Sequence, residues 1–309
     1  MKLARSCLLL CLAGLAVMSS ATFGASLSTR FFSNRDGLRL HYLEAGSGPQ
    51  TIVFVPGWLM PAAVFRLQLQ ALGDEFRVLA FDPRSQGLSE ISHGPHDPAR
   101  RMADLEDFLL AAGVGDYVLA GWSLGVLESL DFIEQKPQEG LRGLVLIDNS
   151  IGEGRPPAAS SSRRRDDLND PKRREEYLTN FCRGIFRTPP PADIADAVLR
   201  SALRVPAGAA RQLLGQPYPR TYWRDIVARQ EVPVLYAIRP RLREQGEALQ
   251  RRKGELAQVE VFEEAGHTLF VDEPSRFNSL VAAFSRRTFM SLPDGARSAS
   301  NGRPPVSDN

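Results

Sequence analysis

The most informative motif in the sequence is Gly121-Trp122-Ser123-Leu124-Gly125. It fits the pattern G-x-S-x-G and stands between a short apolar run at 117–120 and a helical pattern at 124–135. A strand that passes directly into a helix needs a sharp turn, and glycines on both sides of a serine relieve the crowding there. We therefore predict that Ser123 is a nucleophile presented above a sheet, rather than a serine that only caps a helix.

Apolar runs on both sides of this motif recur at intervals typical of a sheet crossed by helices. The expected strands are 38–45, 51–55, 77–81, 117–120, 144–147, 234–238 and 259–262. The expected helices are 62–72, 98–112, 124–135, 243–253 and 274–289. The first strand alternates like an antiparallel edge strand. The whole pattern predicts the α/β fold class, with a mostly parallel sheet covered by helices on both faces.

The composition interrupts this rhythm twice. Between 151 and 231, Pro- and Ser-rich turns separate several short helical patterns, which indicates an inserted helical cap. From 291 onward Ser, Pro, Gly, Asn and Asp prevail without apolar periodicity, which is typical of a disordered tail. The expected organisation is a first core part at 27–150, the cap at 151–231, a second core part at 232–290 and the tail at 291–309.

The first residues indicate targeting rather than folded structure. Lys2 and Arg5 precede an apolar run at 7–18, and small residues at 19–21 offer a cleavage site. This order predicts a signal peptide at 1–21 and an exported protein, periplasmic or secreted. An uncleaved anchor is the alternative, although the apolar run is shorter than the ~20 residues that span a bilayer.

The charge balance leaves a small, neutral substrate open. Lys and Arg total 38 against 36 acidic residues, which gives no field strong enough to attract nucleic acid or an anionic membrane. Hydrophobic residues make up 43%, so most of the chain can bury a core. Together with the serine nucleophile predicted above, this leads us to expect a small-molecule acyl substrate, no nucleic acid, and no stable membrane insertion once the leader is removed. The oligomeric state stays open.

Two further motifs support the interpretation of Ser123 as a nucleophile. Val55-Pro56-Gly57-Trp58 follows an early strand, and Phe81-Asp82-Pro83-Arg84-Ser85-Gln86-Gly87-Leu88-Ser89 follows another. With these three motifs, the chain resembles the α/β-hydrolase family over nearly all of its length after the leader. The resemblance is to the branch with a serine nucleophile, which includes esterases and haloperoxidase-like proteins. The resemblance implies that the backbone amides of Trp58 and Leu124 form an oxyanion hole.

The sequence departs from the family pattern at two positions. Pro56 stands where the family usually carries His, and Ser85 replaces the first Gly of the D-x-R-G-x-G-x-S loop. The backbone donor at the first position is still available, because it does not depend on the side chain. Asp82 and Arg84 in the second loop are interpreted as structural.

A general base for Ser123 must come from four histidines if the mechanism is of the Ser-His-acid type. Of these, His267 follows the last expected strand, in a segment that resembles the histidine loop of the family. Imidazole suits the role because its pKa of ~6.5 allows it to accept and return a proton near neutral pH. We predict that His267 is the base and assign no role to His41, His93 or His96.

The acidic residue of the expected Ser-His-acid set is the one that the sequence identifies least clearly. The family usually carries it after the strand at 234–238, but that place reads Arg239-Pro240-Arg241-Leu242-Arg243, and the first carboxylate there is Glu244. Some members, including haloalkane dehalogenases, carry the acid after the preceding strand, where this chain has Asp148. We favour Asp148 and keep Glu244 as the alternative.

These residues predict a serine hydrolase that cleaves a small carboxylic ester through an acyl-enzyme intermediate. Lactones and carbon–carbon bonds are alternative targets. The missing late acid and Pro56 also leave open a non-catalytic binding or sensor protein on a degenerate scaffold. No metal-ligand cluster or phosphate-binding loop is visible in the sequence, so no cofactor and no metal are implied.

Overall fold

The computed structural model describes residues 25–136, 139–154, 167–215 and 217–290. The signal peptide expected at 1–21 and the tail expected at 291–309 lie outside these residues. Residues 155–166 and 216 of the interval expected to form the cap lie outside them as well.

An eight-stranded sheet forms the centre of the chain, in the order β1-β2-β4-β3-β5-β6-β7-β8. Its strands are β1 (Leu27–Ser33), β2 (Arg39–Ala45), β3 (Gln50–Val55), β4 (Arg77–Asp82), β5 (Asp116–Trp122), β6 (Leu141–Ile147), β7 (Val234–Ile238) and β8 (Ala257–Val261). β2 runs antiparallel to both of its neighbours, and the strands from β4 to β8 are parallel. The mostly parallel sheet predicted from the sequence is confirmed.

The edge position predicted for the strand at 38–45 is wrong. That strand is β2, and it lies between β4 and a strand that the apolar pattern did not predict, β1. β1 was missed because its side chains are exposed or only half-buried, so it lacks a buried apolar face. Its pairing with β2 places β1 at the edge of the sheet.

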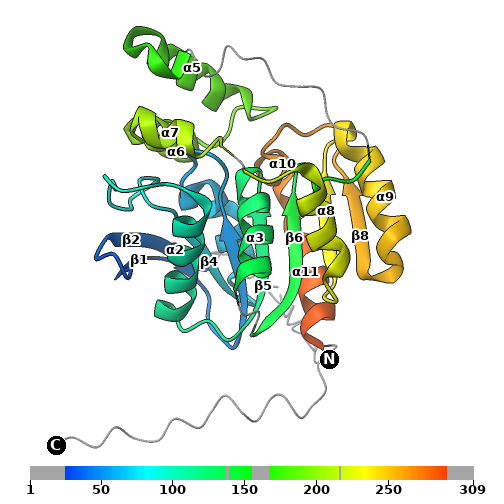
Figure 1. Cartoon of the computed structure of the whole chain (residues 1–309). Coiled ribbons are helices and arrows are strands. Elements are labelled where there is room, and N and C mark those ends of the chain that lie inside the picture. The colour runs from blue at the N-terminus through cyan, green and yellow to red at the C-terminus, as the bar shows by residue number, and fades with distance from the viewer. Residues whose placement is uncertain (1–24, 137–138, 155–166, 216, 291–309) are drawn as a thin grey trace, which may run out of the picture.

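The helices cover both faces of this sheet. They are α1 (Arg66–Leu72), α2 (Pro98–Ala111), α3 (Leu124–Gln135), α5 (Pro171–Gly184), α6 (Ala192–Arg204), α7 (Ala207–Gln212), α8 (Arg220–Arg229), α9 (Arg243–Lys253), α10 (Leu269–Asp272) and α11 (Pro274–Met290). Side chains alternate along β3, with Ile52 and Phe54 in one core and Val53 and Val55 in the other. α1 and α11 pack on the first face, and α2, α3, α8 and α9 pack on the second (Figure 1).

Three helices of the inserted interval lie together beyond the sheet. α5, α6 and α7 are stacked above the sheet in Figure 1, and their buried apolar residues join the first core. α8, from the same interval, instead packs against α3 and contributes Trp223, Ile226 and Val227 to the second core. The interval expected to form a cap therefore also supplies one helix that covers the sheet.

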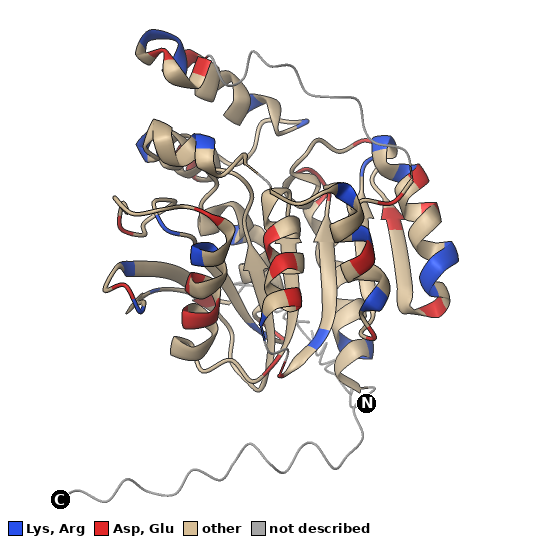
Figure 2. Cartoon of the chain, viewed as in Figure 1, with Lys and Arg blue, Asp and Glu red and all other residues tan. Residues whose placement is uncertain are grey.

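The surface carries charges of both signs. Figure 2 shows basic and acidic residues interspersed along the ribbons of α5 and α9. Within the described ranges, none of the helices combines the length and apolar character needed to cross a membrane.

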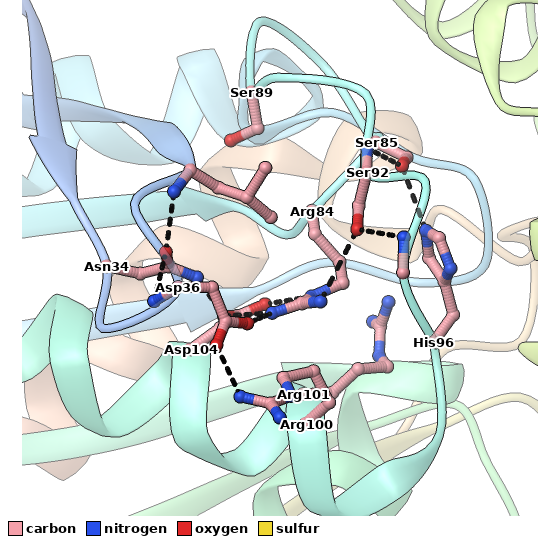
Figure 3. Close-up of polar contacts among 12 residues, drawn as sticks. Asn34, Asp36, Arg84, Ser85, Ser89, Ser92, His96, Arg100, Arg101 and Asp104 are labelled. Atoms are coloured by element: carbon pink, nitrogen blue, oxygen red, sulfur yellow. Dashed lines mark hydrogen bonds and ion pairs between the residues drawn. The ribbon is translucent and has the colours of Figure 1, made fainter.

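Asp82 and Arg84 hold together the loop that follows β4. Asp82 is buried and accepts hydrogen bonds from the amides of Ala62 and Leu88. Arg84 is also buried, and its Nε and Nη2 donate to the carboxylate of Asp104 on α2 at 2.6 and 2.7 Å (Figure 3). Within the described residues, neither side chain forms a hydrogen bond or ion pair with Ser123, which agrees with the structural role expected from the sequence.

We predict that Arg84→Ala lowers the free energy of unfolding by about 3–5 kcal/mol, because it leaves Asp104 buried without its cation. Arg100→Ala is the matched control. Arg100 pairs with Asp36 in the same cluster (Figure 3). Its side chain is 36% exposed, so its removal should cost less than about 1 kcal/mol. Urea unfolding followed by circular dichroism measures both, and equal losses would contradict the interpretation.

Candidate active site

Ser123 stands in a strained turn between β5 and α3. Its φ of 54° is in the left-handed region, which costs a non-glycine residue about 1–3 kcal/mol. Glycines make this turn sterically possible: a Cβ on Gly121 would collide with the carbonyl of Gly125, and a Cβ on Gly125 would collide with the carbonyl of Val55. The Nδ2 of Asn149 donates to the carbonyl oxygen of Ser123 at 2.7 Å and stabilises the turn from the next strand.

His267 reaches Ser123 from the loop after β8. Its Nε2 lies 2.9 Å from the Oγ of Ser123. The loop is fixed from two sides, since the indole Nε1 of Trp122 donates to the carbonyl of His267 at 2.9 Å, and the amide of Thr268 donates to the carbonyl of Ile185 at the end of α5. The imidazole is therefore held where it can accept the proton of the serine hydroxyl.

Asp148 completes the arrangement from the carboxyl end of β6. It also has a positive φ, 46°, and its side chain is fully buried. Its Oδ2 lies 2.6 Å from the Nδ1 of His267. This contact favours the tautomer in which Nδ1 carries a proton and Nε2 faces the serine.

The structure does not bring the alternative acid to this place. Glu244 lies in the first turn of α9 with an exposed side chain. The carboxylate that contacts the imidazole within the described residues is that of Asp148. The geometry thus unites Ser123, His267 and Asp148 and leaves Glu244 apart.

The loop after β3 lies directly against the serine. A Cβ on Gly57 would stand 3.0 Å from the Cβ of Ser123, so the backbone that leads into Trp58 packs against the serine. Leu124 is the first residue of α3, and its amide is one of the helix N-terminal donors that lack an intrahelical acceptor. Neither amide has an acceptor among the hydrogen bonds of the described residues. Both are available to a developing oxyanion.

The cap helices hold the loop that carries Trp58. The indole Nε1 of Trp58 donates to the carbonyl of Ala210 on α7 at 2.8 Å, and its ring meets that of Phe181 on α5 edge to face. Ser201 on α6 donates through its hydroxyl to the carbonyl of Leu59 at 2.7 Å. The backbone of Leu59 has a φ of 65°, so this loop is itself strained. A movement of the cap helices would therefore also move the loop that carries Trp58 and Leu59.

The sequence predicted no role for Arg239, which stands where the family usually carries the acid. In the structure its Nε donates to the Oδ2 of Asp148 at 2.6 Å, and its backbone amide donates to Oδ1 at 3.1 Å. The sequence does contain a signal for this pair. Asp148 and Arg239 each follow directly after a predicted strand, and the ends of neighbouring parallel strands lie close together. Asn149 was also missed, since an Asn in a strand-end loop carries no specific pattern.

The charges around the site shift both titrating groups. Burial raises the pKa of Asp148, but the hydrogen bond to His267 and the charges of His267, Arg239 and Arg241 outweigh burial and lower it overall. Burial lowers the pKa of His267. Asp148 opposes this effect, Arg239 and Arg241 add to it, and the pKa lies below its ordinary value. The site therefore favours an ionised Asp148 beside a neutral His267.

The other histidines lie apart from the serine. His41 contacts Asp82 through Nδ1 at 2.7 Å, and His96 contacts the hydroxyl of Ser85 through Nε2 at 2.9 Å. Burial, together with Arg101 and Arg84, lowers the pKa of His96 to about 4. His93 is exposed. Within the described residues, His267 is the histidine that contacts Ser123.

A cavity of about 380 Å³ opens between α5 and α6 in the cap. Its lining includes Cys182, Phe186 and Leu199, and it includes neither Ser123 nor His267. Burial raises the pKa of the Cys182 thiol to about 12, so this cysteine is a packing residue rather than a nucleophile.

Relatives of known name match part of the chain. The pimeloyl-[acyl-carrier protein] methyl ester esterase of Vibrio campbellii is 33% identical over 99 residues, 32% of this chain and 37% of that protein. The human serine hydrolase BPHL is 33% identical over 116 residues, 36% of this chain and 40% of that protein. Each match thus spans less than half of the relative's length.

Solved structures match nearly the whole fold. The esterase EaEST from Exiguobacterium antarcticum superposes with a TM-score of 0.71 at 21% identity, covering 83% of this chain and 98% of that one. The bromoperoxidase from Bacillus anthracis gives the same TM-score at 17% identity, covering 84% and 100%. At these identities the likeness concerns the fold. The sequence model of the alpha/beta hydrolase family matches residues 52–280, most of the described chain, and the protein therefore belongs to the alpha/beta hydrolase family.

Proposed function

We propose that the chain is a serine hydrolase that cleaves a small carboxylic ester through an acyl-enzyme intermediate. One observation carries the proposal: a continuous path of short contacts joins the Oγ of Ser123 to His267 at 2.9 Å and His267 to the buried Asp148 at 2.6 Å. The amides of Trp58 and Leu124 lie beside this path. They supply donors where an oxyanion would form.

In the first half-reaction, the Nε2 of His267 accepts the proton of Ser123 while Oγ forms a bond to the ester carbonyl carbon. The carbonyl electron pair moves to oxygen, where the amides of Trp58 and Leu124 stabilise the charge. The intermediate then expels the alcohol oxygen, which takes the proton from Nε2 of His267. The acyl group is left on Ser123.

In the second half-reaction, His267 accepts a proton from water as the water oxygen attacks the acyl carbon. The second oxyanion uses the same amide donors. Its collapse breaks the bond to Oγ, which takes the proton back from His267, and the carboxylic acid leaves. Asp148 remains ionised and stabilises the imidazolium in both halves.

The names of the relatives support an ester as the substrate class. One relative is named a methyl ester esterase and another a serine hydrolase. Both are 33% identical to this chain over the matched part. The cap is the part of this fold that shapes a substrate pocket, and its sequence does not identify the acyl or alcohol group. We therefore propose the reaction class without a specific substrate.

The first prediction concerns the nucleophile. Ser123→Ala should lower kcat for p-nitrophenyl acetate by roughly 10⁴-fold or more, because no oxygen remains to carry the acyl group. A fluorophosphonate probe should label the wild type and not the variant. The assay panel includes a lactone and a diketone, so that the preferred carbonyl class is measured at the same time. A folded wild type that neither reacts with the probe nor hydrolyses any member of the panel would favour the non-catalytic binding protein.

The second prediction separates the two candidate acids. Asp148→Asn should lower kcat by about 10³-fold or more, because the amide cannot stabilise the imidazolium or enforce the same tautomer. Glu244→Gln is the control and should stay close to wild type, since Glu244 is exposed and does not contact His267. Circular dichroism verifies that both variants are folded. The reverse pattern of activities would reassign the acid.

The third prediction concerns pH. Only neutral His267 can accept the serine proton, so kcat/KM rises with pH through the pKa of His267 and is lost below it. Because that pKa lies below its ordinary value, the midpoint of the acid limb should fall below ~6.5. Initial rates of ester hydrolysis across buffers from about pH 4 to about pH 9 measure it. A midpoint at or above neutrality would contradict the electrostatic description of the site.

A further inference from the structure

Arg239 holds the carboxylate of Asp148 by two separate donors. The side-chain Nε bonds Oδ2 at 2.6 Å, and the backbone amide bonds Oδ1 at 3.1 Å. Both oxygens of the carboxylate are thus tied to the residue that follows β7. A carboxylate fixed at both oxygens cannot turn away from the imidazole, so Arg239 determines the direction in which Asp148 points.

The same oxygen of Asp148 serves two donors. Oδ2 lies 2.6 Å from the Nδ1 of His267 and 2.6 Å from the Nε of Arg239. The Nη2 of Arg239 lies 3.4 Å from the Nδ1 of His267. When Nδ1 carries its proton, both nitrogens are donors, so their approach is repulsive. A positive charge on the ring increases this repulsion.

The charge balance around the ring differs from that of a simple serine-histidine-acid arrangement. One carboxylate faces the imidazole and two guanidinium groups, because the Nη2 of Arg241 lies 3.7 Å from the Oδ2 of Asp148. Asp272, the acid on α10, directs its oxygens to the amides of Gly266 and Arg187 rather than to the ring. Much of the negative charge that would stabilise an imidazolium is therefore already neutralised by arginine.

We propose that Arg239 is a positioning residue of this site: its guanidinium holds Asp148 against His267 and opposes a positive charge on the His267 ring. The base is consequently kept in its neutral, proton-accepting form at mildly acidic pH. The lowered pKa of His267, to which burial and the two arginines contribute against Asp148, agrees with this arrangement. The consequence for catalysis rests on the proposed function, whereas the electrostatic effect does not.

Arg239→Gln tests the proposal because it removes the charge and keeps a side-chain amide donor and the backbone amide. We expect the acid limb of kcat/KM to move up by about one pH unit, with activity about tenfold lower well below the midpoint and little changed on the plateau. Arg239→Lys retains a cation and should keep the limb near its wild-type position. Arg243→Gln is the matched control, since Arg243 pairs with Glu263 at the surface and should show no shift.

A second readout does not depend on turnover. The imidazole of His267 is titrated by histidine ¹H–¹⁵N NMR in the intact chain, its signal assigned by comparison with His267→Gln. The midpoint should rise by about one unit in Arg239→Gln, whether or not an ester is hydrolysed. Absence of ester hydrolysis with this shift would therefore overturn the proposed function and leave the role of Arg239 standing.

Two outcomes would overturn the role of Arg239. One is an unchanged His267 midpoint in folded Arg239→Gln, and the other is a loss of activity that is equal at every pH. If Arg239→Gln does not fold, Arg241→Gln replaces it, because Arg241 is 48% exposed and lies farther from Asp148. That variant should shift the midpoint upward by a smaller amount, and a downward or absent shift would contradict the proposal.

Discussion

A carboxylate that is sealed from solvent must be paired, and the pairing of Asp148 organises the whole site. Its partners come from chain positions 91 and 119 residues away, Arg239 after β7 and His267 after β8. They meet because parallel strands end at a common edge of the sheet. The same edge carries Ser123 at the end of β5. The sheet therefore brings together groups that have no proximity in the sequence.

The second constraint is backbone strain beside the serine. Leu59, Ser123 and Asp148 all have positive φ, and each is held by a specific hydrogen bond or turn rather than by its own preference. Cap helices supply some of these bonds, to Trp58 and Leu59. The cap therefore fixes the loop that lies beside Ser123, and the positions of the cap and of this loop are coupled.

The sequence predicted the sheet and its helices well where the periodicity was strong. Helix 124–135 coincides with α3, and the strands at 77–81 and 234–238 agree with β4 and β7 within one residue. β1 was missed because half-buried and exposed strands lack an apolar signature. α8 lies within the interval read as a cap, although it packs on the core, because its apolar stripe does not reveal which surface it covers.

The order of residues along the chain was sufficient to predict the local elements: a glycine-flanked serine between a strand and a helix, a histidine after the last strand, and an apolar pattern that specifies an α/β sheet. It left Asp148 and Glu244 as two candidates for the acid that pairs with His267. The folded chain distinguishes the two acids, because it brings Asp148 into contact with His267 and leaves Glu244 at the surface. The reason is that turn geometry follows from neighbouring residues, whereas contacts between strand ends, including that of Arg239 with Asp148, follow from strand order and register.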